Sequence, residues 1–417
     1  MKLFHFLLLS QLLLCTLVCS HHGGPHDDDD HDHHDHHDHQ HTEEKALLQL
    51  TAANLQFSYK LYYHLATAYA NKNFFFSPLS ISVAFSLLSL GAKSKTLSQI
   101  REAFGFNTSL ISEEDIHKGF QQLLKTINHP KSNLQLDSAN ALFIDDKINL
   151  LDKFLNDTKN FYQAEAISTD FQKIMEAIIR INSYVEEKTH GKIEALLDSL
   201  DPLTVLVIVN TIFFKGSWEH SFNVNHTREG DFYVDKDTVV KVPMMTRRGE
   251  YLMAVLPEVG CALVDIPYKG NASAIIVLPE KGKLHEVEKA FQKVSLATWA
   301  KEMRPREILL TIPKVSITGE LDLVKELQAL GITDVFSDHA DLSGITGGSN
   351  LKVSKALHKA ALDIDEEGTE AAAATAIGIK KLSLPFHFKV DSPFIFTMIF
   401  KDTGTVGFTG RIINPKQ

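Results

Sequence analysis

Residues 203–214 read LTVLVIVNTIFF, an almost unbroken run of apolar and β-branched side chains. Such a run predicts a β-strand that is covered on both faces, because a strand with one face in water alternates apolar and polar residues. A strand of this kind belongs in the interior of a sheet with further layers around it. The stretch therefore predicts a domain that is built on large sheets.

Further strand patterns follow this stretch, and helix patterns precede it. Strands are expected at 272–279, 307–317 and 393–400, and the turn sequence KDTGT followed by VGFTGRII predicts a closing hairpin. Apolar residues spaced three and four apart predict amphipathic helices over 47–70 and 116–127. Because helices dominate the first half and strands the second, the predicted fold class is α+β.

The globular part of the chain is expected to be one domain, from residue 45 to residue 417. A chain of 417 residues is usually divided, but some mixed folds keep a single core at this length. The composition stays globular over this range, with no internal repeat and no linker rich in proline, glycine or serine. One compact domain is the simplest interpretation.

Residues 1–20 have the form of a secretory signal peptide. One lysine precedes an apolar run that is too short for a comfortable membrane span, and Val18 and Ser20 mark a cleavage site. No later run of about 18 apolar residues follows, so the mature chain is expected to be soluble, secreted and extracellular, without a membrane partner. Four Asn-x-Ser/Thr sequons agree with export and predict glycosylation. They begin at Asn107, Asn156, Asn225 and Asn271.

Cys261 is the one cysteine that the mature chain keeps, because Cys15 and Cys19 leave with the signal peptide. An internal disulfide is therefore impossible. Cys261 is expected to be a small buried hydrophobe, and a reactive or partner-linked thiol is the alternative.

Residues 21–44 are expected to form a disordered tail. The sequence HHGGPHDDDDHDHHDHHDHQH holds ten histidines and seven aspartates without any lysine, arginine or aromatic residue, so it cannot bury enough apolar surface to fold. The tail is expected to be a solvated segment without a specific ligand. The alternative is that it binds zinc or copper loosely, or binds a partner in a pH-dependent way. No cofactor is predicted. The weak candidates for a metal are His31, His33, His34, His36 and His37.

The charge balance excludes two classes of partner. The chain carries 42 lysines and arginines against 52 aspartates and glutamates, for a formal net charge of −10, and residues 21–41 supply −7 of this charge. The rest of the chain is only weakly acidic and has no basic run interleaved with aromatic residues. Nucleic acids and anionic membranes are therefore not expected as partners.

The chain is not expected to be an enzyme, because it contains none of the motifs G-x-S-x-G, H-E-x-x-H, G-x-x-x-x-G-K-[ST], G-x-G-x-x-G and C-x-x-C. Its unusual feature is GTEAAAATAIGIKKLSLP at 368–385. A loop of about twenty residues between strong strand patterns is uncommon unless it is functional or disordered. A flexible linker or a fraying alanine helix is the alternative.

Six separate and ordered segments resemble the serpin family, and most closely its alpha-1-antitrypsin-like plasma members. The segments are FFSPLSIS (75–82), VNTIFFKGSW (209–218), VPMM (242–245), HKAALDIDEEGTEAAAAT (358–375), FKVDSPFIFTM (388–398) and GFTGRIINP (407–415). The resemblance runs from about Lys45 to Gln417, so the tail is not part of it. It implies an α+β domain with three β-sheets, eight or nine helices and an exposed reactive-centre loop at about 366–385.

The resemblance implies a secreted inhibitor that acts as a suicide substrate and is expected to be a monomer. An extracellular serine protease would cleave the loop, form a covalent acyl complex and be trapped when the cut loop inserts into the main sheet as a further strand. Small hinge residues suit this insertion, because they enter between existing strands without needing new volume. The hinge residues are Glu366, Gly368, Thr369, Ala371, Ala372, Ala373 and Ala374.

The family pattern, counted from Glu366, places the reactive bond between Leu382 and Ser383. Leu382 would fill a hydrophobic primary pocket, so chymotrypsin-like or elastase-like proteases are the expected targets. Cleavage after Lys381 by a trypsin-like enzyme is the alternative.

The resemblance also assigns structural control of the sheet. Ser77, Ser80, Asn210 and His358 match the family's shutter, which holds the strands that must part; four ordinary buried polar residues are the alternative. Lys314 is expected to form a pair with Glu366 that braces the base of the loop.

The alternative function is that of a non-inhibitory plasma serpin that binds a small hydrophobic ligand or a protein partner. Such carriers often have bulky or charged residues at the hinge. Here Gly368, Thr369 and the four alanines that follow Glu370 are small, so the hinge favours an inhibitor.

Overall fold

The computed structural model describes residues 34–128, 134–348, 351–367 and 385–417, and their side chains from Glu44 onward. The α-helices of these residues are α2 (His34–Ala68), α3 (Pro78–Ser89), α4 (Ser94–Ala103), α5 (Glu113–Ile127), α6 (Asp152–Tyr162), α7 (Ile174–Lys188), α8 (Leu284–Phe291), α9 (Leu296–Ala300), α10 (Leu323–Ala329) and α11 (Ser343–Thr346). The strands are β1 (Phe74–Phe76), β2 (Leu134–Asp145), β3 (Glu165–Thr169), β4 (Leu206–Gly216), β5 (Arg228–Tyr233), β6 (Val239–Leu256), β7 (Cys261–Pro267), β8 (Ala272–Pro279), β9 (Arg304–Pro313), β10 (Val315–Asp322), β11 (Lys355–Ile364), β12 (Phe386–Lys389), β13 (Phe394–Phe400) and β14 (Val406–Ile412).

The strands of the described residues form two hydrogen-bonded sheets. The five-stranded sheet has the order β10-β11-β4-β2-β3, and the nine-stranded sheet has the order β1-β14-β13-β8-β7-β6-β9-β12 with β5 beside β6. The predicted α+β class is confirmed, but three separate sheets were expected. The 18-residue strand β6 explains the difference, because it pairs with β5 and β9 along most of its length and with β7 at its end, and so joins two smaller sheets into one.

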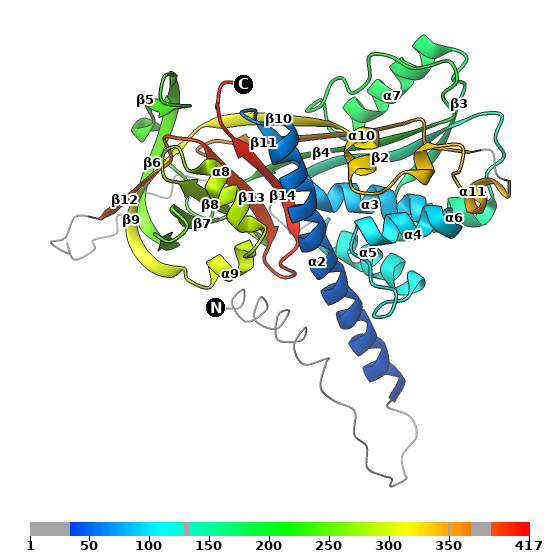
Figure 1. The fold of residues 1–417 in the computed structure, drawn as a ribbon, viewed down its shortest axis with the longest axis horizontal. Coiled ribbons are helices and arrows are strands. Elements are labelled where there is room, and N and C mark those ends of the chain that lie inside the picture. The colour runs from blue at the N-terminus through cyan, green and yellow to red at the C-terminus, as the bar shows by residue number, and fades with distance from the viewer. Residues whose placement is uncertain (1–33, 129–133, 349–350, 368–384) are drawn as a thin grey trace, which may run out of the picture.

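The central strand of the five-stranded sheet is the apolar stretch that predicted it. β4 lies between β11 and β2 (Figure 1). Its side chains are buried on both faces. On one face Val207, Val209 and Phe213 pack beneath α7. On the other face Leu206, Ile208 and Phe214 join the main core, which α3 also contacts. The prediction of a strand covered on both faces is confirmed.

Most of the other predicted elements are confirmed, and one is corrected. The strands at 272–279 and 393–400 are β8 and β13, and β13 forms the predicted hairpin with β14. The predicted strand at 307–317 is two strands, because the chain leaves β9 at Pro313 and enters the other sheet as β10. Ten α-helices are described where eight or nine were expected, since α9 and α11 have only five and four residues.

Helix α2 begins earlier than expected. It starts at His34, so residues 34–44 are helical where disorder was expected, and Figure 1 shows the first turns of α2 projecting beyond the sheets. Burial of Leu50, Phe57 and Leu61 holds the later turns in place. Once a helix is nucleated, each further hydrogen bond requires only one more residue to be ordered. The polar end of α2 can therefore continue without packing against the rest of the protein.

The expectation for Cys261 is also met. Cys261 is buried at the start of β7, and burial raises the pKa of its thiol to about 12, as expected for a small buried hydrophobe. Among the helices in the described ranges, none is long and apolar enough to cross a bilayer.

Candidate functional site

The candidate site is the seam between β4 and β11, where the chain leaves the five-stranded sheet for residues 368–384. The two strands are parallel and pair directly, from Lys355 opposite Val207 to Leu362 opposite Phe214. A segment that turned back after β11 would be antiparallel to both strands, because β4 and β11 run the same way. The topology can therefore accept one more strand at this seam, provided that the β4–β11 ladder opens.

Four polar side chains, which the family resemblance assigned to the shutter, lie together beneath this seam. The backbone N–H of Ser77 donates to Nε2 of His358 at 3.0 Å, and Nδ1 of His358 lies 2.6 Å from Oδ1 of Asn210. Nδ2 of Asn210 donates to Oγ of Ser80 at 2.7 Å. All four residues are buried, and they connect the start of α3 to β4 and β11.

The hydrogen bonds of this cluster fix the protonation state of His358. Because Nε2 accepts from a backbone N–H, the proton of the neutral ring is on Nδ1, where it donates to Asn210. Burial lowers the pKa of His358 to about 3. A second proton on Nε2 would face the N–H of Ser77, so the cluster requires the neutral ring.

The cluster also ties strands together. Oγ of Ser77 donates to the backbone oxygen of Gly407 in β14, at 2.6 Å. Nδ2 of Asn210 also lies 2.5 Å from Oδ1 of Asn140 in β2. The hydrogen bonds therefore cross from β11 through β4 to β2, and opening the seam must rearrange those between His358 and Asn210.

Glu366 anchors the base of the loop. Its carboxylate accepts from Nζ of Lys314 at 2.9 Å and from Oγ1 of Thr227 at 2.7 Å. The Glu366 side chain is only 9% exposed, whereas that of Lys314 is 47% exposed. Burial alone would raise the pKa of Glu366, but the hydrogen bonds from Lys314 and Thr227 outweigh burial, and its pKa is lowered. The predicted pair is present, and its carboxylate is buried.

The neighbours of Glu366 are held from the end of β4. Nε1 of Trp218 donates to the backbone oxygen of Asp365 at 2.8 Å, and Lys215 forms ion pairs with Asp365 at 3.2 Å and Glu367 at 2.6 Å. The backbone N–H of Phe222 donates to the backbone oxygen of Glu366. The chain is therefore fixed on several sides at the last residues before the loop.

Some of these contacts involve residues that the sequence did not predict, and some predicted residues lie outside the described structure. Asn140 and Thr227 were not predicted, because a single polar residue in a strand or turn has no distinctive pattern. Lys215 and Trp218 lie in the quoted segment 209–218, which was the available signal. The reactive bond Leu382–Ser383 and the hinge from Gly368 to Ala374 lie outside the described residues.

The other predicted positions can be placed in part. Asn107, Asn156 and Asn225 are exposed, whereas Asn271 is partly buried and its Oδ1 accepts from the backbone N–H of Asp402. The candidate metal ligands His31 and His33 lie outside the described residues, and the side chains of His34, His36 and His37 are not described. In the part of the chain whose side chains are described, no three potential metal ligands cluster.

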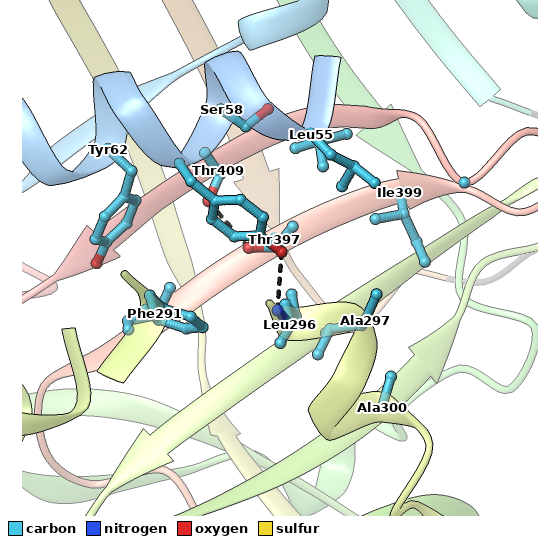
Figure 2. Close-up of a pocket in the computed structure, with 15 residues that line it drawn as sticks. Leu55, Ser58, Tyr62, Phe291, Leu296, Ala297, Ala300, Thr397, Ile399 and Thr409 are labelled. Atoms are coloured by element: carbon cyan, nitrogen blue, oxygen red, sulfur yellow. Dashed lines mark hydrogen bonds between the residues drawn. The ribbon is translucent and has the colours of Figure 1, made fainter. Parts of the chain in front are cut away.

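A separate apolar pocket lies between α2, the short helices α8 and α9, and the strands β13 and β14. Figure 2 shows Leu55 and Tyr62 of α2 facing Phe291, Leu296 and their neighbours across this pocket. Its polar groups are paired, since Thr397 bonds Thr409 at 2.9 Å and the backbone N–H of Leu296 donates to the hydroxyl of Tyr59 at 2.8 Å. The cavity measures about 40 Å³.

Comparison with known protein families gives one match across the chain. The family described as serpin (serine protease inhibitor) matches residues 52–415. Alpha-1-antitrypsin-like protein GS55-MS of Ictidomys tridecemlineatus is 47% identical over 90% of this chain and 91% of its own length. Alpha-1-antiproteinase of Bos taurus is 44% identical over 90% of this chain and 91% of its own length.

Solved structures of related proteins share the fold. Human thyroxine-binding globulin complexed with thyroxine has a TM-score of 0.83 and 38% identity, over 89% of this chain and 99% of that structure. Uncleaved ovalbumin also has a TM-score of 0.83, with 30% identity over 88% of this chain and 100% of that structure.

Proposed function

This chain belongs to the serpin family of serine protease inhibitors, and we propose that it inhibits an extracellular serine protease as a suicide substrate. The protease attacks the bond between Leu382 and Ser383, and its catalytic serine forms an ester with the carbonyl carbon of Leu382. The segment beginning at Ser383 leaves with the new amino terminus. Residues 368–382 then move into the seam between β4 and β11, carrying the acylated enzyme with them.

The observation that carries this proposal is the direct pairing of β4 with β11 beside the base of the loop. The loop starts at the end of β11, so the inserting strand needs no crossover connection and pairs antiparallel with both neighbours. The small residues Thr369, Ala371 and Ala373 would face the core side of the sheet, where little free volume exists. The hydrogen bond between His358 and Asn210, together with the backbone ladder, holds the seam closed until cleavage.

Incubation with chymotrypsin and, separately, with trypsin tests the proposal. A covalent band that survives boiling in detergent is expected with chymotrypsin. Mass spectrometry of the released carboxyl-terminal fragment should find Ser383 at its start. A fragment that starts at Leu382 would assign specificity to Lys381, and complete cleavage by both enzymes without any covalent band would contradict inhibition.

Secretion and glycosylation are part of the proposal. The signal-like residues 1–20 support export, and the exposure of Asn107, Asn156 and Asn225 supports their use as glycan acceptors. Amino-terminal sequencing of the protein from culture medium should begin near His21. Enzymatic removal of N-glycans should lower its apparent mass.

Carriage of a small hydrophobic ligand is the second candidate function. It is supported by the apolar pocket in Figure 2 and by the likeness to thyroxine-binding globulin. The volume of about 40 Å³ is far below the roughly 300 Å³ or more of typical ligand sites, so α9 or its side chains would have to move. Calorimetric titration with thyroxine is expected to show no binding. Micromolar binding together with the absence of a covalent protease complex would favour the carrier.

A further inference from the structure

Phe386 is a large apolar side chain that the fold leaves in solvent. It is the first residue of β12, the edge strand of the nine-stranded sheet, and it is 46% exposed. Phe388 lies two residues later on the same face of the strand and is only 2% exposed. The core therefore uses the second aromatic residue of this strand and leaves the first at the rim.

The neighbours of Phe386 show how β12 is held without it. β12 pairs in parallel with β9, with Phe386 opposite Ile308 and Phe388 opposite Leu310. On the other face, His387 bonds Oγ1 of Thr311 at 3.1 Å. The strand is thus fixed by its backbone ladder, by buried Phe388 and by His387.

The position of Phe386 relative to the loop indicates what covers it. The loop residues 368–384 lie outside the described structure and end two residues before Phe386. Leu382 precedes Phe386 by four residues, which an extended chain spans in about 13 Å. A serine protease in contact with an inhibitor buries roughly 800 Å² on each partner, or about 20 to 30 residues a side, which is far more than the residues in its active site.

We infer that Phe386 is a specificity-determining contact, which packs on an apolar surface of the target protease beside its active site. The inference rests on the proposed function. An enzyme bound at the bond between Leu382 and Ser383 is at most four residues of chain from Phe386, and its contact surface is broad enough to reach this rim of the sheet; the same holds for cleavage after Lys381, one residue further away. Because an aromatic anchor gains most from a desolvated apolar partner, Phe386 selects against proteases with charged surfaces at this position.

The second-order rate constant for covalent complex formation with chymotrypsin measures this contact. Phe386→Ala should lower the rate constant by roughly tenfold, Phe386→Glu should lower it further, and Phe386→Leu should restore most of it. The number of inhibitor molecules consumed per enzyme molecule trapped should stay unchanged, because the hinge is intact. Leu203→Ala is the matched control. Leu203 is 84% exposed and precedes β4, so it lies at the end of the seam far from the loop, and its substitution should leave the rate constant unchanged.

Each other outcome would count against the inference. An unchanged rate constant for Phe386→Ala, in a protein that forms the complex, would overturn this inference and leave the proposed function intact. A lower melting temperature with more inhibitor consumed per enzyme trapped would assign Phe386 a structural role. A change from dimer to monomer on gel filtration would show that a second copy covers it. A wild-type chain that traps no protease would overturn the proposed function as well.

Discussion

At the scale of single residues, the hydrogen bonds of His358 at the seam between β4 and β11 require a neutral ring. Its Nε2 accepts from the backbone of Ser77, so the ring can hold its place only in the neutral form. Burial lowers the pKa of His358 to about 3, whereas an unfolded histidine has a pKa of about 6.5. Between these two pH values the unfolded chain binds a proton that the native chain does not bind. Native stability should therefore fall as the pH falls below about 6.5, by up to about 1.4 kcal/mol per pH unit.

Substitution of His358 by glutamine tests this pH dependence. The variant should be about 1 to 3 kcal/mol less stable at pH 7, because glutamine cannot keep both hydrogen bonds of the ring, the one from the N–H of Ser77 and the one to Asn210, and it should lose less stability between pH 7 and pH 5 than the wild type. His117 is also buried, and burial lowers its pKa to about 4, so it contributes equally to both proteins. His190→Gln, at a side chain 73% exposed, is the control and should follow the wild type. If the free energies of unfolding of His358→Gln and of the wild type fell in parallel as the pH was lowered, His358 would not be the source of the pH dependence.

The contact between Lys314 and Glu366 allows a second prediction. Lys314→Ala leaves Thr227 as the remaining side-chain donor to a buried carboxylate, so the free energy of unfolding should fall by about 1 to 2 kcal/mol. Because the pKa of Glu366 is lowered in the folded protein, the stabilisation by the ion pair with Lys314 is present at pH 7. It is lost as the pH falls through the folded pKa. Thermal unfolding at pH 7 and pH 3.5 measures the difference.

A surface ion pair provides the control for Lys314→Ala. Lys352 pairs with Asp338, and both side chains are well exposed, at 42% and 91%. Lys352→Ala should change stability by about 0.5 kcal/mol or less. Equal effects of the two substitutions would show that Lys314 acts only as a surface charge.

At the scale of elements, the hinge is the segment in which side-chain size decides the outcome. Ala371 would face the core side of the sheet after insertion, so Ala371→Glu should bury a carboxylate without a partner and slow insertion. The protease would then complete hydrolysis, and the variant should be cleaved without forming a covalent complex. Ala372→Glu places the same charge on the opposite face and should keep more of the complex. Gel densitometry of complex against cleaved product measures both, and a wild-type amount of complex with Ala371→Glu would rule out insertion in this orientation.

The sequence predicted elements well where a single pattern decides them. The nearly unbroken apolar run before Phe214 predicted the central strand, and the spacing of Leu50, Phe57 and Leu61 predicted α2. It did not predict the division at Lys314, because residues 307–317 are apolar on both sides of it and the change of sheet depends on distant pairing. The joining of two sheets through β6 likewise depends on pairing between strands that are distant in the sequence. Similarly, the shutter residues were found by their resemblance to a family, because isolated serines and asparagines have no periodicity.

At the scale of the whole molecule, the proposed insertion requires that the native chain is not in its most stable state. One ladder joins β4 to β11 in the native sheet, and an inserted segment of similar length would replace it with two. With a register of eight residue pairs, the net gain of one ladder is on the order of 8 kcal/mol, at about 1 kcal/mol for each hydrogen bond. Cleavage within the loop should release this difference, since it frees the segment from Pro385 and β12.

Heating the intact and the cleaved protein measures the stored free energy. Protein cut beside Leu382 should melt roughly 10 to 20 °C higher than intact protein, because the inserted strand raises the free energy of unfolding. Protein cut near Leu203, at the opposite end of the seam, should gain nothing, since the loop stays attached at both ends. The Ala371→Glu variant, cut beside Leu382, should gain less than the wild type. If cut and intact wild-type protein melt together, the native sheet stores no free energy, and a protease bound to the loop would be released as from any other substrate.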